Sequence, residues 1–288
     1  PPPPPPHPDF FFPQKTAYEI SLGLVVSEIF IRDSYAVGLG RVESFYSDPN
    51  DPNRIYLGSR SGGFWKTLDG GNTWTNTTDF LFAAGVNTMA VSPDNPNYIL
   101  INVRNSKNGV THGIYESNDG GDTWNITNFN PENLSWGGLG TYDSVYKIAY
   151  HPTIPDLVFI GSSEGLFRST DNLNSWINCP TGNSWEWDYD FNEIHFHPTD
   201  ENIVYSAAYN EDSKIYISND GGLTFTKSNT IVGNSSDIKL SVSAACSNCV
   251  YVGSSAGVWK STDNGQNFSL VSNPGISNYG AFAVSDID

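Results

Sequence analysis

Short apolar segments alternate with polar turns from about residue 38 onward, and two phrases recur along the chain in a fixed order. One phrase ends in a large aromatic residue, and its copies are KTLDGGNTW (66–74), ESNDGGDTW (116–124), RSTDNLNSW (168–176), ISNDGGLTF (217–225) and KSTDNGQNF (260–268). The other phrase precedes each copy and joins two apolar runs through a turn that usually contains proline, as in AYHPTIPDLVFIGS (149–162). Self-similarity at a nearly fixed spacing indicates a repeat architecture.

Each repeat reads as four short strands, the last two joined by an Asp-Gly turn. This pattern predicts a four-stranded antiparallel meander of about 45–50 residues, the size of one propeller blade. The Asp-Gly pairs suit tight hairpins because glycine supplies a positive φ and aspartate bonds to amides of its own turn. We therefore predict an all-β fold, a β-propeller with five blades visible plus the start of a sixth. Inner strands are expected near residues 41–47, 86–92, 144–150, 191–197 and 238–244.

The repeats also predict the domain organisation. Residues 1–17 are a Pro-rich extended N-terminal segment, and residues 18–288 form the propeller. The expected blades are 38–80, 84–130, 142–180, 190–232 and 236–275, with a further blade starting at 279–288. We interpret the chain as part of a longer propeller; the alternative is that residues 18–35 pair with the last strand and close the ring.

The phrase S/T-x-D-x-G-x-T/S-W resembles the Asp-box, or BNR repeat, of bacterial sialidases, sortilin-type receptors, xyloglucanases and photosystem assembly factors. The resemblance covers roughly residues 38–288. The segment GGFWKTLDGGNTW is most similar to large secreted Bacteroidetes proteins, many of which use type IX secretion with a C-terminal sorting domain. The resemblance therefore implies an extracellular or cell-surface location and further domains of the same polypeptide.

Sialidase active sites lie on the face opposite the Asp-boxes, so the resemblance implies a structural role for the repeated residues. These are Asp69, Trp74, Asp119, Trp124, Asp171, Trp176, Asp220, Phe225, Asp263 and Phe268. A calcium loop is the alternative for ESNDGGDTW. However, Asp119 and Asp122 are not followed by the glutamate that such a loop requires. We predict no metal site and no cofactor.

Catalytic residues known from the resembling enzymes do not carry over. Xyloglucanases place an acid in a TDxGG-like stretch of the first blade, where this chain has Arg60 in SRSGG. Sialidases use three arginines and an RIP motif, and this chain has no RIP. If the protein is a glycoside hydrolase, its paired carboxyl groups must come from Glu164, Glu186, Asp188 or Asp190.

Two long loops, 130–144 and 179–191, do not follow the repeat and carry aromatic and acidic residues. The candidate ligand-binding residues are Trp136, Tyr142, Trp185, Glu186, Trp187, Asp188 and Tyr189. Aromatic rings can stack on sugar faces or form a protein-binding hot spot, and the alternative is simple packing against the blade. We predict a secreted or cell-surface module for binding or adhesion to polysaccharide or a partner protein. The alternatives are a sialidase-like or xyloglucanase-like glycoside hydrolase, and a structural spacer in a surface adhesin or filament.

The net charge limits the classes of partner, and the three cysteines predict one disulfide. With 14 basic and 31 acidic residues the net charge is −17, which disfavours nucleic acid and anionic lipid. Without an apolar run of about 18 residues, we predict no direct membrane insertion. Cys246 and Cys249 occupy a turn that other repeats stiffen with proline. We predict a short disulfide there and a free Cys179.

Overall fold

The structure is a computed structural model in which residues 41–81, 85–106, 109–133, 144–181, 190–209, 214–230, 232, 238–275 and 282–284 are described. The described residues form strands and turns without a helix, grouped in five four-stranded antiparallel sheets. This arrangement confirms the predicted all-β propeller fold. The third sheet, for example, pairs its strands in the sequential order of a meander.

The strands of the five sheets are as follows. Sheet 1 has β1 (Val42–Ser47), β2 (Ile55–Ser59), β3 (Gly63–Thr67) and β4 (Thr75–Asn76). Sheet 2 has β5 (Gly85–Val91), β6 (Ile99–Arg104), β7 (Thr111–Ser117) and β8 (Asn125–Ile126). Sheet 3 has β9 (Val145–Tyr150), β10 (Val158–Ser162), β11 (Gly165–Ser169) and β12 (Ile177–Asn178). Sheet 4 has β13 (Asp190–Phe196), β14 (Val204–Tyr209), β15 (Lys214–Ser218) and β16 (Thr226–Lys227), and sheet 5 has β17 (Lys239–Ser243), β18 (Cys246–Ser254), β19 (Gly257–Ser261) and β20 (Ser269–Ser272).

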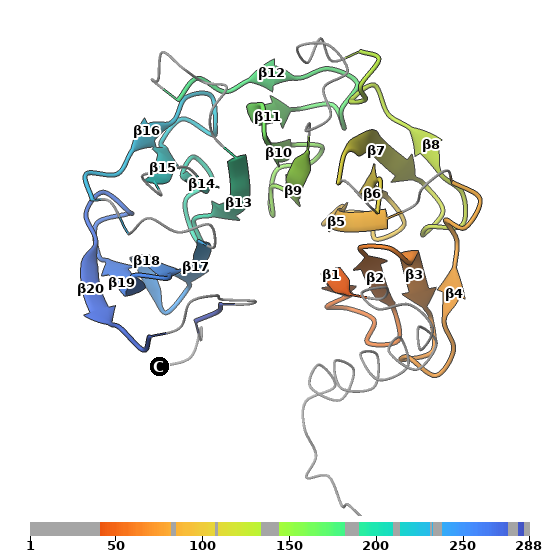
Figure 1. The fold of residues 1–288 in the computed structure, drawn as a ribbon, viewed down its shortest axis with the longest axis horizontal. Helices are drawn as coiled ribbons and strands as arrows, with labels where there is room; N and C mark the ends of the chain where they lie inside the picture. The colour runs from red at the N-terminus through yellow and green to blue at the C-terminus, as the bar shows by residue number, and fades with distance from the viewer. Residues whose placement is uncertain are drawn as a thin grey trace, which may run out of the picture.

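The sheets stand in an arc around a common centre, with the first strand of each sheet innermost and the short fourth strand on the rim (Figure 1). Sheets 1 and 5 occupy the two ends of the arc. The ends of the inner strands lie within one residue of the positions predicted from the repeats. Because neighbouring strands are antiparallel, the β1–β2 type of turn and the Asp-Gly turns share one face. The turns between second and third strands, and the connections between sheets, share the opposite face.

The second strands are enclosed by the sheets on either side, and every residue of β2 and of β10 is buried. Gly161 in β10 shows how closely adjacent sheets approach, because a Cβ added there would lie 2.4 Å from the backbone oxygen of Phe191 in β13. Glycine at this position therefore lets sheet 4 approach sheet 3.

Each turn between a third and a fourth strand contains an aspartate followed by Gly or Asn, here called an Asp turn, and is closed by a carboxylate that accepts several local hydrogen bonds. In the first turn, Asp69 accepts from the Thr73 amide at 2.9 Å and the Thr73 hydroxyl at 2.6 Å. Thr67 donates to the same carboxylate at 2.7 Å. These bonds, those from Thr73 first, lower the pKa of Asp69 to about 2. The same pattern recurs at Asp119, Asp171, Asp220 and Asp263.

The aromatic residue after an Asp turn connects its sheet to the one before. The Trp124 ring lies 4.9 Å from the Phe64 ring of sheet 1, edge on, and its indole nitrogen donates to the Thr77 hydroxyl at 3.1 Å. Equivalent residues of later sheets also contact the preceding sheet: Trp176, Phe225 and Phe268.

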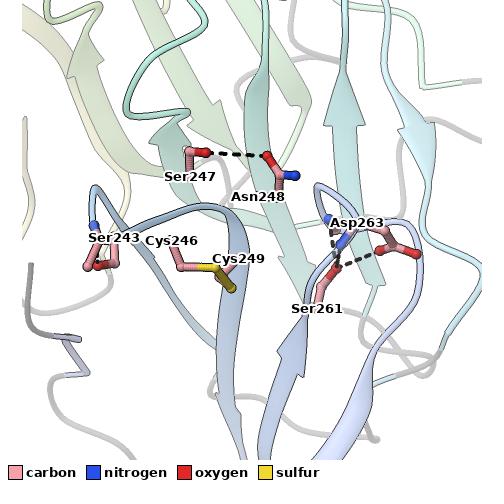
Figure 2. Close-up of a disulfide and its surroundings, with 9 residues drawn as sticks. Ser243, Cys246, Ser247, Asn248, Cys249, Ser261 and Asp263 are labelled. Carbon is pink, nitrogen blue, oxygen red and sulfur yellow. Dashed lines mark hydrogen bonds between the residues drawn. A yellow bond between two sulfur atoms is a disulfide. The ribbon is translucent and has the colours of Figure 1, made fainter. Parts of the chain in front are cut away.

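A disulfide between Cys246 and Cys249 lies at the start of β18 (Figure 2). A backbone hydrogen bond of 3.0 Å from Asn264 to Asn248 joins this segment to the Asp turn of the same sheet. The third cysteine, Cys179, is buried, and burial raises the pKa of its thiol to about 12. Cys179 therefore stays a thiol at neutral pH.

Candidate active site

The predicted ligand-binding residues cannot be placed in this structure. Trp136, Tyr142, Trp185, Glu186, Trp187, Asp188 and Tyr189 lie outside the described residues. The rest of the face opposite the Asp turns is described in part. It carries carboxylates, arginines and a tyrosine near the first residues of the inner strands.

Asp190 opens β13 and meets Tyr146 of β9, whose hydroxyl donates a hydrogen bond to the Asp190 carboxylate. Burial raises the pKa of Asp190, and the hydrogen bond from Tyr146 only partly offsets this effect. Burial and the charge of Asp190 raise the pKa of Tyr146 as well, so the phenol keeps its proton. Desolvation thus favours a protonated carboxyl group at Asp190.

Glu193 lies three residues further along β13, and its pKa is shifted in the opposite direction. It is 8% exposed and accepts from Lys239 of β17 and from the ring of His195, both at 3.0 Å. Burial alone would favour the neutral acid. The hydrogen bond and charge of His195, with the charges of Lys147 and Lys239, lower the pKa of Glu193 to about 2. Glu193 is therefore ionised at neutral pH.

A hollow of about 540 Å³ opens along the inner strands β1, β5, β9 and β13. Its walls include Lys147 and His195, the residues that flank Glu193, together with apolar groups such as Met89 and Tyr150. A volume of this size falls in the range of small-molecule sites. The hollow also reaches Asp48, Pro49 and Pro152 in the turns on the Asp-turn face, and Glu193 is not one of its lining residues.

A third group lies at the start of β1, where Glu43 faces three arginines. Arg41 Nε lies 3.0 Å from Glu43 Oε1, Arg60 Nη1 lies 3.5 Å from the same oxygen, and Arg104 Nη1 lies 3.8 Å from Oε2. Arg60 is the residue that stands where the resembling xyloglucanases carry an acid. The structure brings the carboxylate of Glu43 to this place from the neighbouring strand.

Of the carboxylates named from the sequence for a hydrolase, two are described. Asp190 joins the site, while Glu164 lies in the turn between β10 and β11, where its amide donates to the Ser162 hydroxyl at 3.0 Å. Sequence reasoning missed Glu43 and Glu193. The available signal was a charged residue inside an otherwise apolar inner-strand phrase.

No group of three or more histidine, cysteine, aspartate or glutamate side chains within the described residues could hold a metal ion. The described residues also contain no helix long and apolar enough to cross a membrane.

The fold and the matches to known proteins define a propeller of the sortilin, sialidase and xyloglucanase type, which confirms the predicted resemblance. A family model described as sortilin, neurotensin receptor 3, matches residues 34–144. The chain is 29% identical over 163 residues to a probable oligoxyloglucan-reducing end-specific xyloglucanase of Neosartorya fischeri, covering 51% of this chain and 18% of that protein. It is 24% identical over 213 residues to a xyloglucanase of Paenibacillus sp, covering 64% and 20%. The chain thus spans about a fifth of the length of these relatives.

Solved structures with the same fold include two GH74 enzymes. The enzyme of Niastella koreensis matches with a TM-score of 0.59 and 20% identity, over 79% of this chain and 38% of that chain. The xyloglucanase of Xanthomonas campestris matches with a TM-score of 0.59 and 18% identity, over 82% and 38%. At this level of identity the likeness shows the fold alone.

These findings correct the functional interpretation made from the sequence. A binding or adhesion module was the main expectation because the catalytic residues of the resembling enzymes are absent at their usual places. The curated relatives are xyloglucanases, which contradicts that expectation and favours the glycoside hydrolase alternative. The sequence-based expectation relied on motif positions such as Arg60, and such positions do not record carboxylates that come from neighbouring strands, such as Glu43.

Proposed function

We propose that the protein is a glycoside hydrolase that acts on a xyloglucan-type polysaccharide. The observation that carries this proposal is the pair Asp190 and Glu193, whose environments move their pKa values in opposite directions. Glycoside hydrolysis uses two carboxyl groups, and a raised pKa marks the group that acts as the proton donor. The names of the curated relatives support the substrate class.

In this proposal Asp190 is the general acid. Its protonated carboxyl group gives a proton to the glycosidic oxygen as the bond to the anomeric carbon breaks. Tyr146 fixes the orientation of the carboxyl group through its hydrogen bond. Once the proton is transferred, the hydrogen bond from Tyr146 stabilises the negative charge that forms on the Asp190 carboxylate.

Glu193 is the ionised partner. A bulge between Phe191 and Glu193 pairs Asp190 with Tyr209 and Glu193 with Ala207 of β14, so both residues lie on the same face of the sheet. In an inverting glycosidase the ionised carboxylate activates a water molecule on the opposite side of the sugar from the acid. A carboxylate here can orient that water and stabilise positive charge at the anomeric carbon. Lys239 and His195 hold it in place.

We also propose that the aromatic residues predicted from the sequence to bind sugar contact the substrate beside Asp190. Residues 182–189 directly precede Asp190 in the chain, so Trp185 and Trp187 are within a few residues of the acid. Indole rings beside a carboxyl group suit the apolar face of a glucose unit. We also propose that the protein acts outside the cell, which the disulfide between Cys246 and Cys249 supports because such bonds persist in oxidising compartments.

The proposal is tested by measuring the new reducing ends that form when the purified protein is incubated with xyloglucan. Asp190→Asn should lower kcat by about 100-fold or more, the usual contribution of a general acid, and should remove the basic limb of the pH–rate profile. Glu164→Gln is the matched control, because Glu164 is a carboxylate on the same face and should have little effect. Trp185→Ala and Trp187→Ala should chiefly raise KM. Wild-type protein without hydrolysis would overturn the function, and loss of activity in Glu164→Gln instead of Asp190→Asn would overturn the assignment of the acid.

A further inference from the structure

The inner strand β5 carries a bulge whose side chains bond to the inner strand of the next sheet. In this bulge Asn87 and Thr88 together oppose the single residue Asn102 of β6, an arrangement that re-aims side chains out of the regular ladder. Asn87 Nδ2 donates to the Val145 carbonyl of β9 at 2.7 Å. The Thr88 hydroxyl accepts a hydrogen bond from the Ile148 amide of β9 at 3.1 Å. Two hydrogen bonds thus join β5 to β9, its neighbour among the inner strands (Figure 1).

The two residues between these hydrogen bonds, Tyr146 and Lys147, act on the two carboxyl groups of the candidate site. Tyr146 donates a hydrogen bond to Asp190. The charge of Lys147 contributes to the lowered pKa of Glu193. The β5 bulge therefore holds the stretch of β9 from which both effects arise.

Tyr146 depends on this support because it lies in a bulge of β9 itself. Val145 pairs with Ser162 of β10. The next pair joins Lys147 to Gly161, which leaves Tyr146 as an extra residue without a place in the ladder. The pairing of the strands alone does not fix where Tyr146 points, whereas Asn87 holds the carbonyl of the residue directly before it.

Asn87 is in turn held by a chain of buried polar side chains within sheet 2. Asn102 Nδ2 donates to Asn87 Oδ1 at 2.8 Å, and the Thr111 hydroxyl donates to Asn102 Oδ1 at 2.5 Å. Asn102 and Thr111 are 1% and 3% exposed, and a buried polar network whose members are paired is rigid. Asn102 Nδ2 also lies 3.4 Å from the Val145 carbonyl oxygen, so Asn87 makes the shorter of the two bonds to it.

We infer that Asn87 is a positioning residue of the candidate site, which holds β9 so that the Tyr146 hydroxyl meets the Asp190 carboxyl group. The role of Asp190 as proton donor rests on the proposed function, whereas the contact between Tyr146 and Asp190 does not. Asn87 bonds to the backbone of β9 and acts on Asp190 through Tyr146. The hydrogen bond from Tyr146 stabilises the charged form of Asp190, so its loss should raise the pKa of Asp190 further.

Titration of Asp190 by carbon-13 NMR of labelled aspartate tests the inference without any need for turnover, and Asp190→Asn assigns the signal. Tyr146→Phe should raise the pKa of Asp190, and Asn87→Ala should produce at least about half of that rise. In the Tyr146→Phe background Asn87→Ala should add nothing, because the two residues act through one hydrogen bond. Asn128→Ala is the matched control and should leave the titration unchanged. Asn128 follows β8 on the rim and also donates to a backbone carbonyl beyond its own sheet, that of Asn174 at 3.3 Å.

A second variant, Asn87→Ser, has a side chain one bond shorter and serves as the test if Asn87→Ala does not fold. Unchanged titration of Asp190 in the folded Asn87 variants would overturn the inference. A full additional rise in the Tyr146→Phe background would also overturn it, as would an equal rise in Asn128→Ala. In hydrolysis of xyloglucan, Asn87→Ala should lower kcat about tenfold or more and change KM little, as expected when a reacting group is misplaced. A raised pKa of Asp190 in variants of a protein that releases no sugar would refute the proposed function alone, because the titration does not depend on hydrolysis.

Discussion

Trp124 offers a direct test of how one sheet stabilises the next. Its side chain is 7% exposed and packs edge on against Phe64 of sheet 1, and its indole nitrogen donates to Thr77 at 3.1 Å. Truncation to alanine removes this buried ring, so Trp124→Ala should lower the free energy of unfolding by about 3–5 kcal/mol. Trp124→Phe keeps an aromatic contact and loses the hydrogen bond, which should cost about 0.5–1.5 kcal/mol.

Trp74 provides the matched control, since it occupies the same position in the first Asp turn. Its indole nitrogen donates to the Gly71 carbonyl of its own turn at 3.0 Å, and the residue is only half-buried. Trp74→Ala should therefore cost less than half as much as Trp124→Ala. Urea unfolding followed by far-ultraviolet circular dichroism measures all three variants without relying on tryptophan fluorescence. Equal losses for Trp74→Ala and Trp124→Ala would refute the idea that contact between sheets, and not the turn itself, dominates.

Two further predictions concern the turns on the Asp-turn face. Burial lowers the pKa of His151, whose Nδ1 accepts the Ile154 amide at 3.1 Å, so the folded state favours the neutral ring. The contribution of the neutral ring to stability should be full above the pKa of histidine in the unfolded chain, about 6.5, and should be lost as the pH falls through the lowered pKa of the folded state. The urea midpoint of the wild-type protein should therefore drop between pH 7 and 5. The drop should be smaller in His151→Gln. For the cysteines, alkylation under denaturing, non-reducing conditions should label Cys179 alone, and reduction should expose Cys246 and Cys249 as well. The double variant Cys246→Ser, Cys249→Ser should lower the free energy of unfolding by about 2 kcal/mol, the value that the loop-entropy relation gives for so short a loop. Three free thiols in the native protein would contradict the disulfide.

The fold could be predicted from the sequence because each repeat encodes its own local geometry. An Asp turn is specified within a few residues, as at Asp69, where the partners are two residues before and four residues after it. Five copies of such a unit fix the strand order without any long-range information. For the same reason the inner strands could be placed to within one residue.

The candidate site could be predicted only in part, because its partners come from different sheets. Tyr146 and Asp190, or Glu193 and Lys239, meet only because the arc brings successive inner strands together. No motif records such a pair. Asp190 was among the candidates since it ends an aromatic and acidic loop, whereas Glu43 was missed because its importance depends on arginines from two neighbouring strands.

The aspartates of this protein differ in how far local hydrogen bonds stabilise their charged form, and this difference separates the turn residues from the proposed proton donor. In the Asp turns each carboxylate accepts local amide and hydroxyl bonds, so that Asp69 and Asp263 have pKa values of about 2. Such a group has no proton to give at neutral pH. Asp190 accepts a hydrogen bond from Tyr146 and is otherwise desolvated, which raises its pKa and makes proton donation feasible. The two kinds of aspartate also lie at opposite ends of the strands. The Asp turns can therefore recur in every repeat, while the candidate site is assembled from residues that do not repeat.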